Sequence, residues 1–220
     1  MEITTLHHFP LLGLVLLTAS LSACQLFKTS TPESQTTSRM QGNLTQSNGQ
    51  WLFQPCTQED SYTLIPSSAL NAEINTLATD ATSGLFADLR GNIDTAKNNF
   101  TPTQRYRLQA EGHDCNDPDF ARLLIRASGT EPFWSILQTP RGLIFNPPGA
   151  SAIALPYIEE QLPEGRFHIS TEANNQKIEL WITPEQCTDS MSGTVYHLSA
   201  SLKWNKQTLH GCAAYGALRN

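Results

Sequence analysis

The stretch Phe167–Thr183, with the sequence FHISTEANNQKIELWIT, decides the fold. Apolar residues alternate with polar ones on both sides of Asn174-Asn175, namely at Phe167, Ile169, Ile178, Leu180 and Ile182. A period of two is typical of a strand with one buried face, and paired asparagines favour a tight hairpin turn. The stretch therefore predicts an antiparallel β-hairpin in a mainly β protein.

The same pattern continues around this hairpin. We predict strands over residues 120–127, 133–138 and 143–145, and a last hairpin over residues 195–204 and 208–212. Thr139-Pro140-Arg141-Gly142 fits a type I turn, and Asn205-Lys206 separates the last two strands. Residues 119–220 are therefore expected to form an antiparallel β sandwich or barrel-like domain.

The first half of the chain predicts a second β unit that contains one helix. Short strand-like runs lie at residues 51–53, 62–65, 85–89 and 106–108. Between them, Leu70, Ile74 and Leu77 share one helical face, and Ser67 or Ser68 is placed to cap that helix. We expect residues 44–118 to form a small antiparallel barrel, with an OB-like topology as one alternative.

The N-terminus has the features of an export signal. The apolar run Leu11–Leu21 is too short to span a bilayer, and Leu21-Ser22-Ala23-Cys24 follows it, although residues 1–10 contain no Lys or Arg. This segment resembles the lipobox of bacterial lipoproteins. The resemblance implies that residues 1–23 are removed and that Cys24 is acylated, which anchors the protein in a membrane through lipid. Residues 24–43 then read as a flexible tether, and Gln25 favours the outer membrane, facing the periplasm.

Charge and motifs exclude several function classes. The chain has 14 basic and 20 acidic residues, and Glu2 is the one acidic residue before Cys24. A mildly acidic chain with scattered charge lacks the electrostatic features of a nucleic-acid-binding protein. It also has no Gly-rich phosphate loop, HExxH or EF-hand motif, so no cofactor is expected.

Four cysteines remain after Cys24, namely Cys56, Cys115, Cys187 and Cys212. An even number in an oxidising compartment favours disulfides, and three pairings are possible. Their order along the chain favours Cys56–Cys115 and Cys187–Cys212. The alternative is a metal site, since His113 and His210 lie close to cysteines, but no CxxC spacing supports it.

Two motifs carry a family resemblance. They are the GxEPFW segment Gly129–Trp134 and the CxDxMSG segment Cys187–Gly193, followed by Gly211-Cys212. Together with Phe53–Cys56 and Leu89–Gly91 they resemble a family of uncharacterised bacterial envelope lipoproteins. The resemblance covers most of the mature chain and implies no activity.

The same motifs supply the candidate site residues. Glu131 is a possible buried acid, because Pro132, Phe133 and Trp134 would desolvate it, and Asp189 is a possible partner for acid–base chemistry. The alternative, which we favour, is a structural role for Glu131 beside a core Trp134. Ser192, Asp189 and His210 offer a nucleophilic triplet, but without a GxSxG motif we expect no enzyme activity.

A further resemblance concerns periplasmic lipoproteins that inhibit c-type lysozyme. Ser192, Gly193 and Tyr196 match the SGxxY motif of that family, whereas Lys206 is followed by Gln207 rather than Gly. The alternative interpretation is an ordinary turn at Ser192-Gly193 before a strand that begins at Tyr196.

The sequence thus favours a non-enzymatic binding module of the cell envelope, with an envelope or cell-wall-associated partner. Its groove is expected to use some of the large aromatic residues Trp51, Phe53, Trp134, Trp181, Tyr196 and Trp204. Alternative functions are inhibition of lysozyme or another wall-degrading enzyme, and a hydrolase or metal-handling role.

Overall fold

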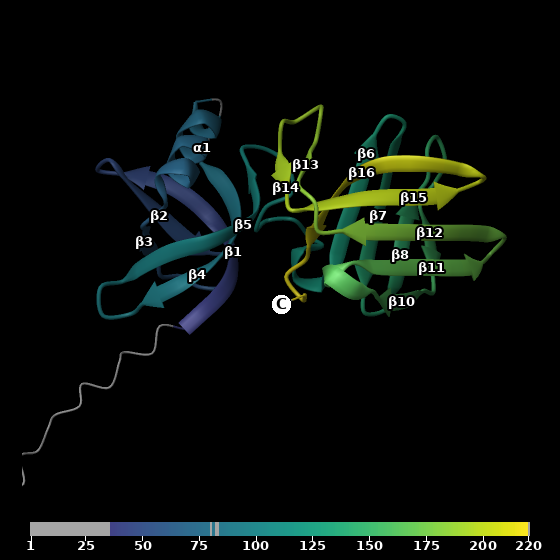
Figure 1. Cartoon of the computed structure of the whole chain (residues 1–220), viewed down its shortest axis with the longest axis horizontal. Coiled ribbons are helices and arrows are strands. Elements are labelled where there is room, and N and C mark those ends of the chain that lie inside the picture. The colour runs from purple at the N-terminus through teal and green to yellow at the C-terminus, as the bar shows by residue number, and fades with distance from the viewer. Residues whose placement is uncertain (1–35, 80, 82–83, 220) are drawn as a thin grey trace, which may run out of the picture. The chain divides into compact units, whose positions relative to one another are not determined.

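The structure is a computed structural model that describes residues 36–79, 81 and 84–219. Residues 35–220 form one compact unit. The predicted signal segment, Cys24 and the first part of the predicted tether lie outside the described residues. No helix within the described part is long and apolar enough to cross a membrane. As predicted, the protein is mainly β, with two barrel-like sheets (Figure 1).

The first sheet contains a closed five-stranded barrel. Its strands are β1 (Thr36–Ser47), β2 (Gln50–Pro55), β3 (Tyr62–Leu64), β4 (Leu85–Asp94) and β5 (Asn99–Gln109). They follow the order β5-β3-β2-β1-β4, and pairing of β4 with β5 closes the barrel. The helix α1 (Ser68–Ala78) connects β3 to β4, and the Ser67 side chain accepts a hydrogen bond from the Leu70 amide at its start. One helix within a five-stranded barrel agrees with the OB-like expectation.

Strand β1 corrects the expected tether, because residues 36–43 pair with a neighbouring strand. The pairing with β4 runs from Thr36–Ile93 to Leu44–Leu85. Met40 packs against the barrel core, and the Arg39 side chain is 5% exposed. In the sequence this segment resembles a tether because it is polar and has no clear period. Its polar side chains pair with residues on neighbouring strands that lie far away in the sequence, so the local pattern does not reveal the strand.

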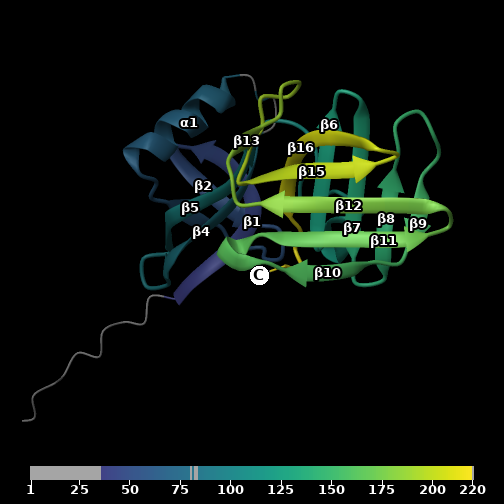
Figure 2. The same ribbon diagram turned by 45° about the vertical axis from the view of Figure 1, so that its right-hand side comes forward.

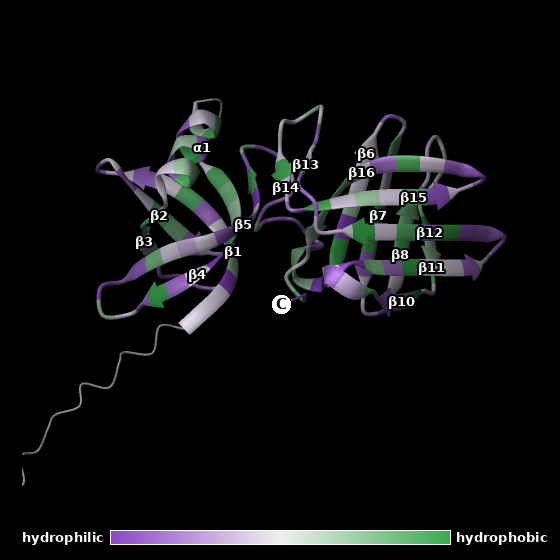
Figure 3. Cartoon of the chain, in the orientation of Figure 1, coloured by the Kyte–Doolittle hydropathy of each residue, from purple (hydrophilic) through white to green (hydrophobic). Residues whose placement is uncertain are grey.

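The second sheet has nine antiparallel strands that curl around one core (Figure 2). The strands are β6 (Ile125–Thr130), β7 (Phe133–Thr139), β8 (Gly142–Asn146), β9 (Ile153–Leu155), β10 (Ile158–Gln161), β11 (Phe167–Ala173), β12 (Gln176–Thr183), β15 (Leu198–Trp204) and β16 (Gln207–Tyr215). Their order is β10-β11-β12-β15-β16-β6-β7-β8-β9. Figure 3 shows how apolar and polar residues alternate along these strands.

The hairpin that decides the fold has its turn where the sequence predicts it. Asn174 and Asn175 both have positive φ, at 52° and 59°, as do Asn205 and Lys206 in the last hairpin. Paired positive φ angles give the primed turns that match the right-handed twist of the strands. One boundary differs from expectation, because residues 120–122 form the short 3₁₀ helix η1 (Phe120–Arg122) and β6 begins only at Ile125. A second short 3₁₀ helix, η2 (Pro163–Gly165), precedes β11.

Two short strands from the C-terminal half join the first sheet. The predicted strand over residues 195–204 is divided between β14 (Val195–Tyr196) and β15. β14 pairs with β5, and β13 (Cys187–Thr188) pairs with β14 at the edge of that sheet. A segment of the C-terminal half thus extends the N-terminal sheet.

Both disulfides join the cysteines in the pairs that we predict from the order of the cysteines along the chain. Cys56 is bonded to Cys115, with 5.2 Å between the Cα atoms, and Cys187 is bonded to Cys212, with 5.5 Å. The second bond joins β13, at the edge of the first sheet, to β16 in the second. Because all four sulfur atoms are oxidised, none is a thiolate that could bind a metal.

Candidate functional site

A polar groove of about 690 Å³ lies over the outer face of the nine-stranded sheet. We call it the hydroxyl groove. The strands β6, β15 and β16 form its floor, and residues of the segment 183–190 complete its lining. Eight of its lining side chains carry a hydroxyl group, namely Ser128, Thr130, Thr183, Thr188, Ser190, Ser199, Ser201 and Thr208.

Strand register places these side chains in rows across the sheet. One row crosses four strands from Ser128 through Cys212 and Ser199 to Thr183. The next row runs from His210 through Ser201 to Trp181. Side chains opposite one another in an antiparallel pair lie about 4.5–5.5 Å apart, so the serine and threonine side chains of each row lie on one face of the sheet, with the Cys212 disulfide within the first row and Trp181 at the end of the second.

The groove contains polar groups that the protein leaves without partners. None of the eight hydroxyl groups makes a hydrogen bond to another residue in the described part of the chain. The lining also includes the carboxylates of Glu131, Glu185 and Asp189 and the His210 ring, but no lysine or arginine. Hydroxyl groups both donate and accept hydrogen bonds, whereas ionised carboxylates only accept. The groove therefore suits a ligand that brings several donors and no negative charge.

Asp189 and Ser192 lie together, but their hydrogen bonds are made within the loop that contains them. The Asp189 carboxylate accepts hydrogen bonds from the amides of Met191 (3.0 Å) and Ser192 (2.8 Å). The Ser192 hydroxyl lies 3.0 Å from the same oxygen and 2.9 Å from the Thr194 hydroxyl. Among the described residues, neither side chain is hydrogen-bonded to His210, which lines the groove. The hypothetical Ser–Asp–His triplet is thus not assembled.

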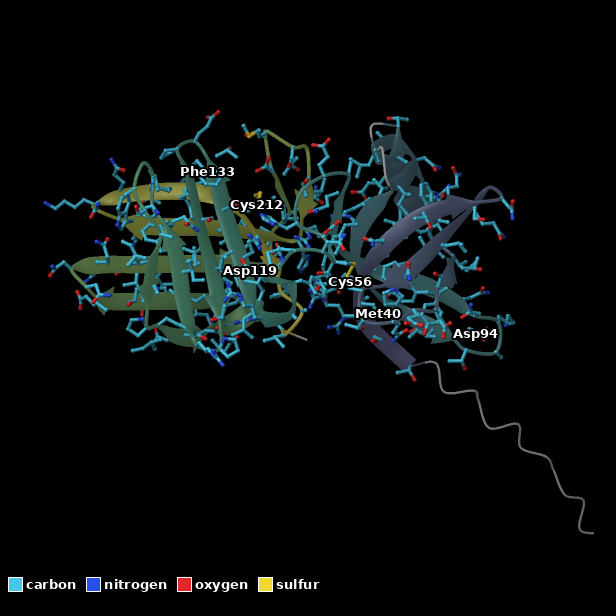
Figure 4. All side chains as sticks on the ribbon, turned by 180° about the vertical axis from the view of Figure 1, so that it is seen from behind. Met40, Cys56, Asp94, Asp119, Phe133 and Cys212 are labelled. Atoms are coloured by element: carbon cyan, nitrogen blue, oxygen red, sulfur yellow. A yellow bond between two sulfur atoms is a disulfide. The ribbon has the colours of Figure 1, made fainter. Side chains whose placement is uncertain are left out.

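Glu131 is exposed, so the less favoured of the two interpretations, a buried acid, is wrong. Glu131 and Pro132, joined by a cis peptide bond, are exposed at the β6–β7 turn, and Phe133 is 65% exposed (Figure 4). Trp134 points the opposite way and is fully buried, because successive side chains of a strand alternate between its faces. Glu131 consequently lies in the groove lining in contact with solvent, and Trp134 cannot touch a ligand.

The glycines of the two motifs make close packing around Trp134 possible. A Cβ atom on Gly129 would lie 2.3 Å from the His210 carbonyl oxygen and 2.4 Å from the Trp134 Nε1 atom. A Cβ atom on Gly211 would lie 2.0 Å from the Ser128 carbonyl oxygen. These residues therefore shape the floor of the groove through the backbone.

Most of the aromatic candidates belong to the interior. Trp51, Phe53 and Trp134 are buried, and Trp204 packs against the second core with its indole donating to Gln176. Trp181 differs, because it is 38% exposed and stands opposite Ser201 of the groove. Its ring stacks on His168 with 4.2 Å between centroids.

Tyr196 does not line the groove. It pairs with Arg107 across β14 and β5, and burial raises the pKa of its phenol. Ser192 and Lys206 are also separated, since β15, a strand of seven residues, connects their two loops. Such a strand spans about 20 Å, so the two residues that the inhibitor resemblance implies do not share one site.

The sequence contains a signal for the groove outside its distinctive motifs, in the Ser and Thr residues of three strands. The outward-facing positions of β6, β15 and β16 are unusually rich in Ser and Thr, yet only strand register shows that they adjoin. No group of three metal-ligating side chains occurs within the described part of the chain. Comparison of the chain with family models, with curated proteins and with solved structures found no match.

Proposed function

We propose that this protein is a lipid-anchored, non-enzymatic binding module of the bacterial envelope, and that the hydroxyl groove binds a cell-wall glycan. One observation supports this proposal most strongly. The distinctive sequence motifs line the same groove, and the hydroxyl groups of that groove have no protein partner. Gly129–Glu131 and Gly211-Cys212 line its floor, and Cys187–Ser190 line its side.

The composition of the groove supports a neutral, donor-rich ligand. Sugar hydroxyl and amide groups supply the donors that three carboxylates and eight hydroxyl groups can accept. The absence of lysine and arginine from the lining disfavours phosphorylated or carboxylated ligands. Trp181 lies beside Ser201 and is 38% exposed, with its ring stacked on His168 and with Lys203 Nζ 5.9 Å from the ring centroid. A sugar would contact the part of the indole that these two side chains leave exposed.

The location of the protein is supported by the two disulfides, which suit an oxidising compartment. Acylation of Cys24 accounts for attachment to the outer membrane. Mass spectrometry of protein purified from membranes should give an N-terminal peptide that begins at Cys24 and carries acyl chains. Cys24→Ser should lack that peptide. A peptide that begins at Met1 without lipid would contradict the anchor.

Glycan binding is tested with the full chain purified in detergent. Tryptophan fluorescence should change on titration with soluble wall fragments without charged peptide, namely N-acetylglucosamine oligosaccharides, because Trp181 is partly exposed. Trp181→Ala should weaken this binding by about 10-fold or more, as expected for an aromatic anchor. Ser201→Ala should also weaken it, in a calorimetric titration that does not depend on the indole signal.

Lys206→Ala provides the matched control, because Lys206 is exposed at the far end of β15 and is absent from the groove lining. Its affinity should equal that of the natural chain. Binding of spermidine but not of wall fragments would contradict the glycan assignment. Absence of binding by either probe at millimolar concentration would contradict the groove as a ligand site.

A further inference from the structure

Arg107 belongs to a polar row on the outer face of the barrel. The row crosses four strands in register, from Gln41 on β1 through Asp88 on β4 and Arg107 on β5 to Tyr196 on β14. These side chains therefore share one face of the first sheet. Asp88 is 1% exposed and Arg107 is 6% exposed, so charge is buried here.

The carboxylates near Arg107 are already bound by other groups. Asp88 accepts hydrogen bonds from Arg39 Nε at 2.8 Å and from Gln41 Nε2 at 2.8 Å, and its second oxygen also pairs with the Arg39 guanidinium. Asp117 is paired with Arg126 at 2.5 Å and with His113 at 2.7 Å. Each acid thus has a cation of its own.

Arg107 has no such partner. Its guanidinium makes no hydrogen bond or ion pair with any residue in the described part of the chain, and its buried Nε atom is unsatisfied. The ring of Phe86 lies 4.3 Å from its central carbon. Burial lowers the pKa of Arg107, yet a guanidinium stays protonated in proteins. Asp88, opposite Arg107 on β4, attracts this guanidinium but is already paired with Arg39, so the buried row has two arginines for one carboxylate. A buried positive charge in excess of the nearby negative charge is unfavourable.

We propose that Arg107 binds a single-atom anion, such as chloride, in the small cavity that it lines. The cavity has a volume of about 20 Å³, which is enough for one small particle such as a water molecule or a halide ion. Arg126 also lines the cavity, but its charge is already paired with Asp117, whereas Phe120 and Leu123 add apolar walls. Apolar walls strengthen the attraction between a guanidinium and an anion.

Two carboxylates also line this cavity, and their own contacts limit their repulsion of an anion. Asp117 is neutralised by Arg126, as described above. Asp114 accepts hydrogen bonds from the Asn116 amide at 2.8 Å and from the Asn116 side chain at 3.3 Å. A water molecule would satisfy the Nε–H group of Arg107 but would leave its charge uncompensated, so an anion is the better occupant.

Thermal unfolding of the full chain tests the proposal. Sodium chloride and sodium bromide should raise the midpoint relative to sodium gluconate at equal ionic strength, because gluconate is too large for the cavity. The rise should saturate, and should reach about 3–6 °C at a halide concentration tenfold above its dissociation constant. Arg107→Met should abolish the difference between halide and gluconate.

Arg122→Met is the matched control, because the Arg122 side chain is 56% exposed and pairs with Asp119. It should keep the halide effect. Equal midpoints in chloride and gluconate, or a halide effect that survives in Arg107→Met, would overturn the proposal. If Arg107→Met does not fold, crystals of the natural chain grown in bromide decide the question. An anomalous peak beside Arg107 is expected, and a water molecule there would overturn the assignment.

Discussion

The outer faces of the two sheets both carry rows of polar side chains. The polar groups of one row are exposed to solvent and have no protein partner, whereas those of the other row are buried and have partners. On the nine-stranded sheet, the hydroxyl groups of Ser128, Ser199 and Ser201 reach a solvent-open groove and have no protein partner. On the barrel, Asp88 is buried and is held by Arg39 and Gln41. The difference follows from water, which satisfies exposed polar groups and is excluded from buried ones.

The barrel row stabilises the fold, whereas the polar groups of the groove are the ones that we propose to bind a ligand. Unpaired groups in the groove cost little in the free protein, so they remain available to a ligand. Paired groups in the barrel row connect β1 to β4 and to the end of β16, because the Gln41 amide donates to both Asp88 and the Tyr215 carbonyl oxygen. Substitutions in the barrel row should therefore change stability, whereas those in the groove should change affinity.

The largest expected effect is that of Asp88→Ala. This change removes the partner of Arg39, whose side chain is 5% exposed, and leaves a second buried cation beside Arg107. Loss of one partner from a buried ion pair costs about 3–5 kcal/mol. The free energy of unfolding in urea should fall by this amount. Asp94→Asn, at the end of β4, weakens an ion pair with Lys97, whose side chain is 74% exposed, and should lower the free energy of unfolding by less than about 1 kcal/mol. A loss equal to that of Asp88→Ala would contradict the distinction.

A smaller effect is expected for the double variant Cys187→Ser with Cys212→Ser. The disulfide closes a loop with a sequence separation of 25, and its loss should lower the free energy of unfolding by about 2–4 kcal/mol. Affinity for wall fragments should also fall, because both cysteines line the groove. The double variant of Cys56 and Cys115 should lose stability but keep its affinity, and equal losses of affinity in both would count against the groove.

Gly129→Ala should cost less, about 1–3 kcal/mol, because the added methyl group meets the His210 carbonyl oxygen and the Trp134 indole. Urea unfolding measures the change. Thr130→Ala on the same strand serves as the control, since its hydroxyl has no protein partner and its loss should change stability by less than about 0.5 kcal/mol. Similar losses in the two variants would show that close backbone approach is not the cause.

The smallest effect concerns pH. Burial and the neighbouring Arg126 lower the pKa of His113 in the folded protein, while Asp117 opposes them. The unfolded chain, with a histidine pKa of about 6.5, then binds the proton more readily. Stability should be full above that pH and should decrease as the pH falls through about 6.5 toward the lower folded pKa.

His113→Gln should make the unfolding midpoint less sensitive to pH between pH 8 and pH 5.5. The pKa of His197 is also lowered, by burial and by Arg105, so part of the sensitivity should remain. The double variant His113→Gln with His197→Gln should remove most of it. An unchanged slope in both variants would assign the pH dependence to other groups.

Local patterns were sufficient for most of the secondary structure. The alternation around Asn174-Asn175, the Ser67 cap of α1 and the even number of cysteines each predict a feature that the structure contains. Each of these signals is contained in a few neighbouring residues or in a simple count. The strand over residues 36–43 was missed because its partners on β4 lie far away in the sequence.

The sequence by itself determined a mainly β chain with one helix, because side-chain alternation and turn residues act over a few positions. Only the tertiary structure decided that β14 extends the barrel sheet, that Trp134 is buried while Glu131 is exposed, and that Ser201 adjoins both His210 and Trp181. Strand order and register are set by packing between distant segments. They therefore determine which polar groups meet water and which must find a partner.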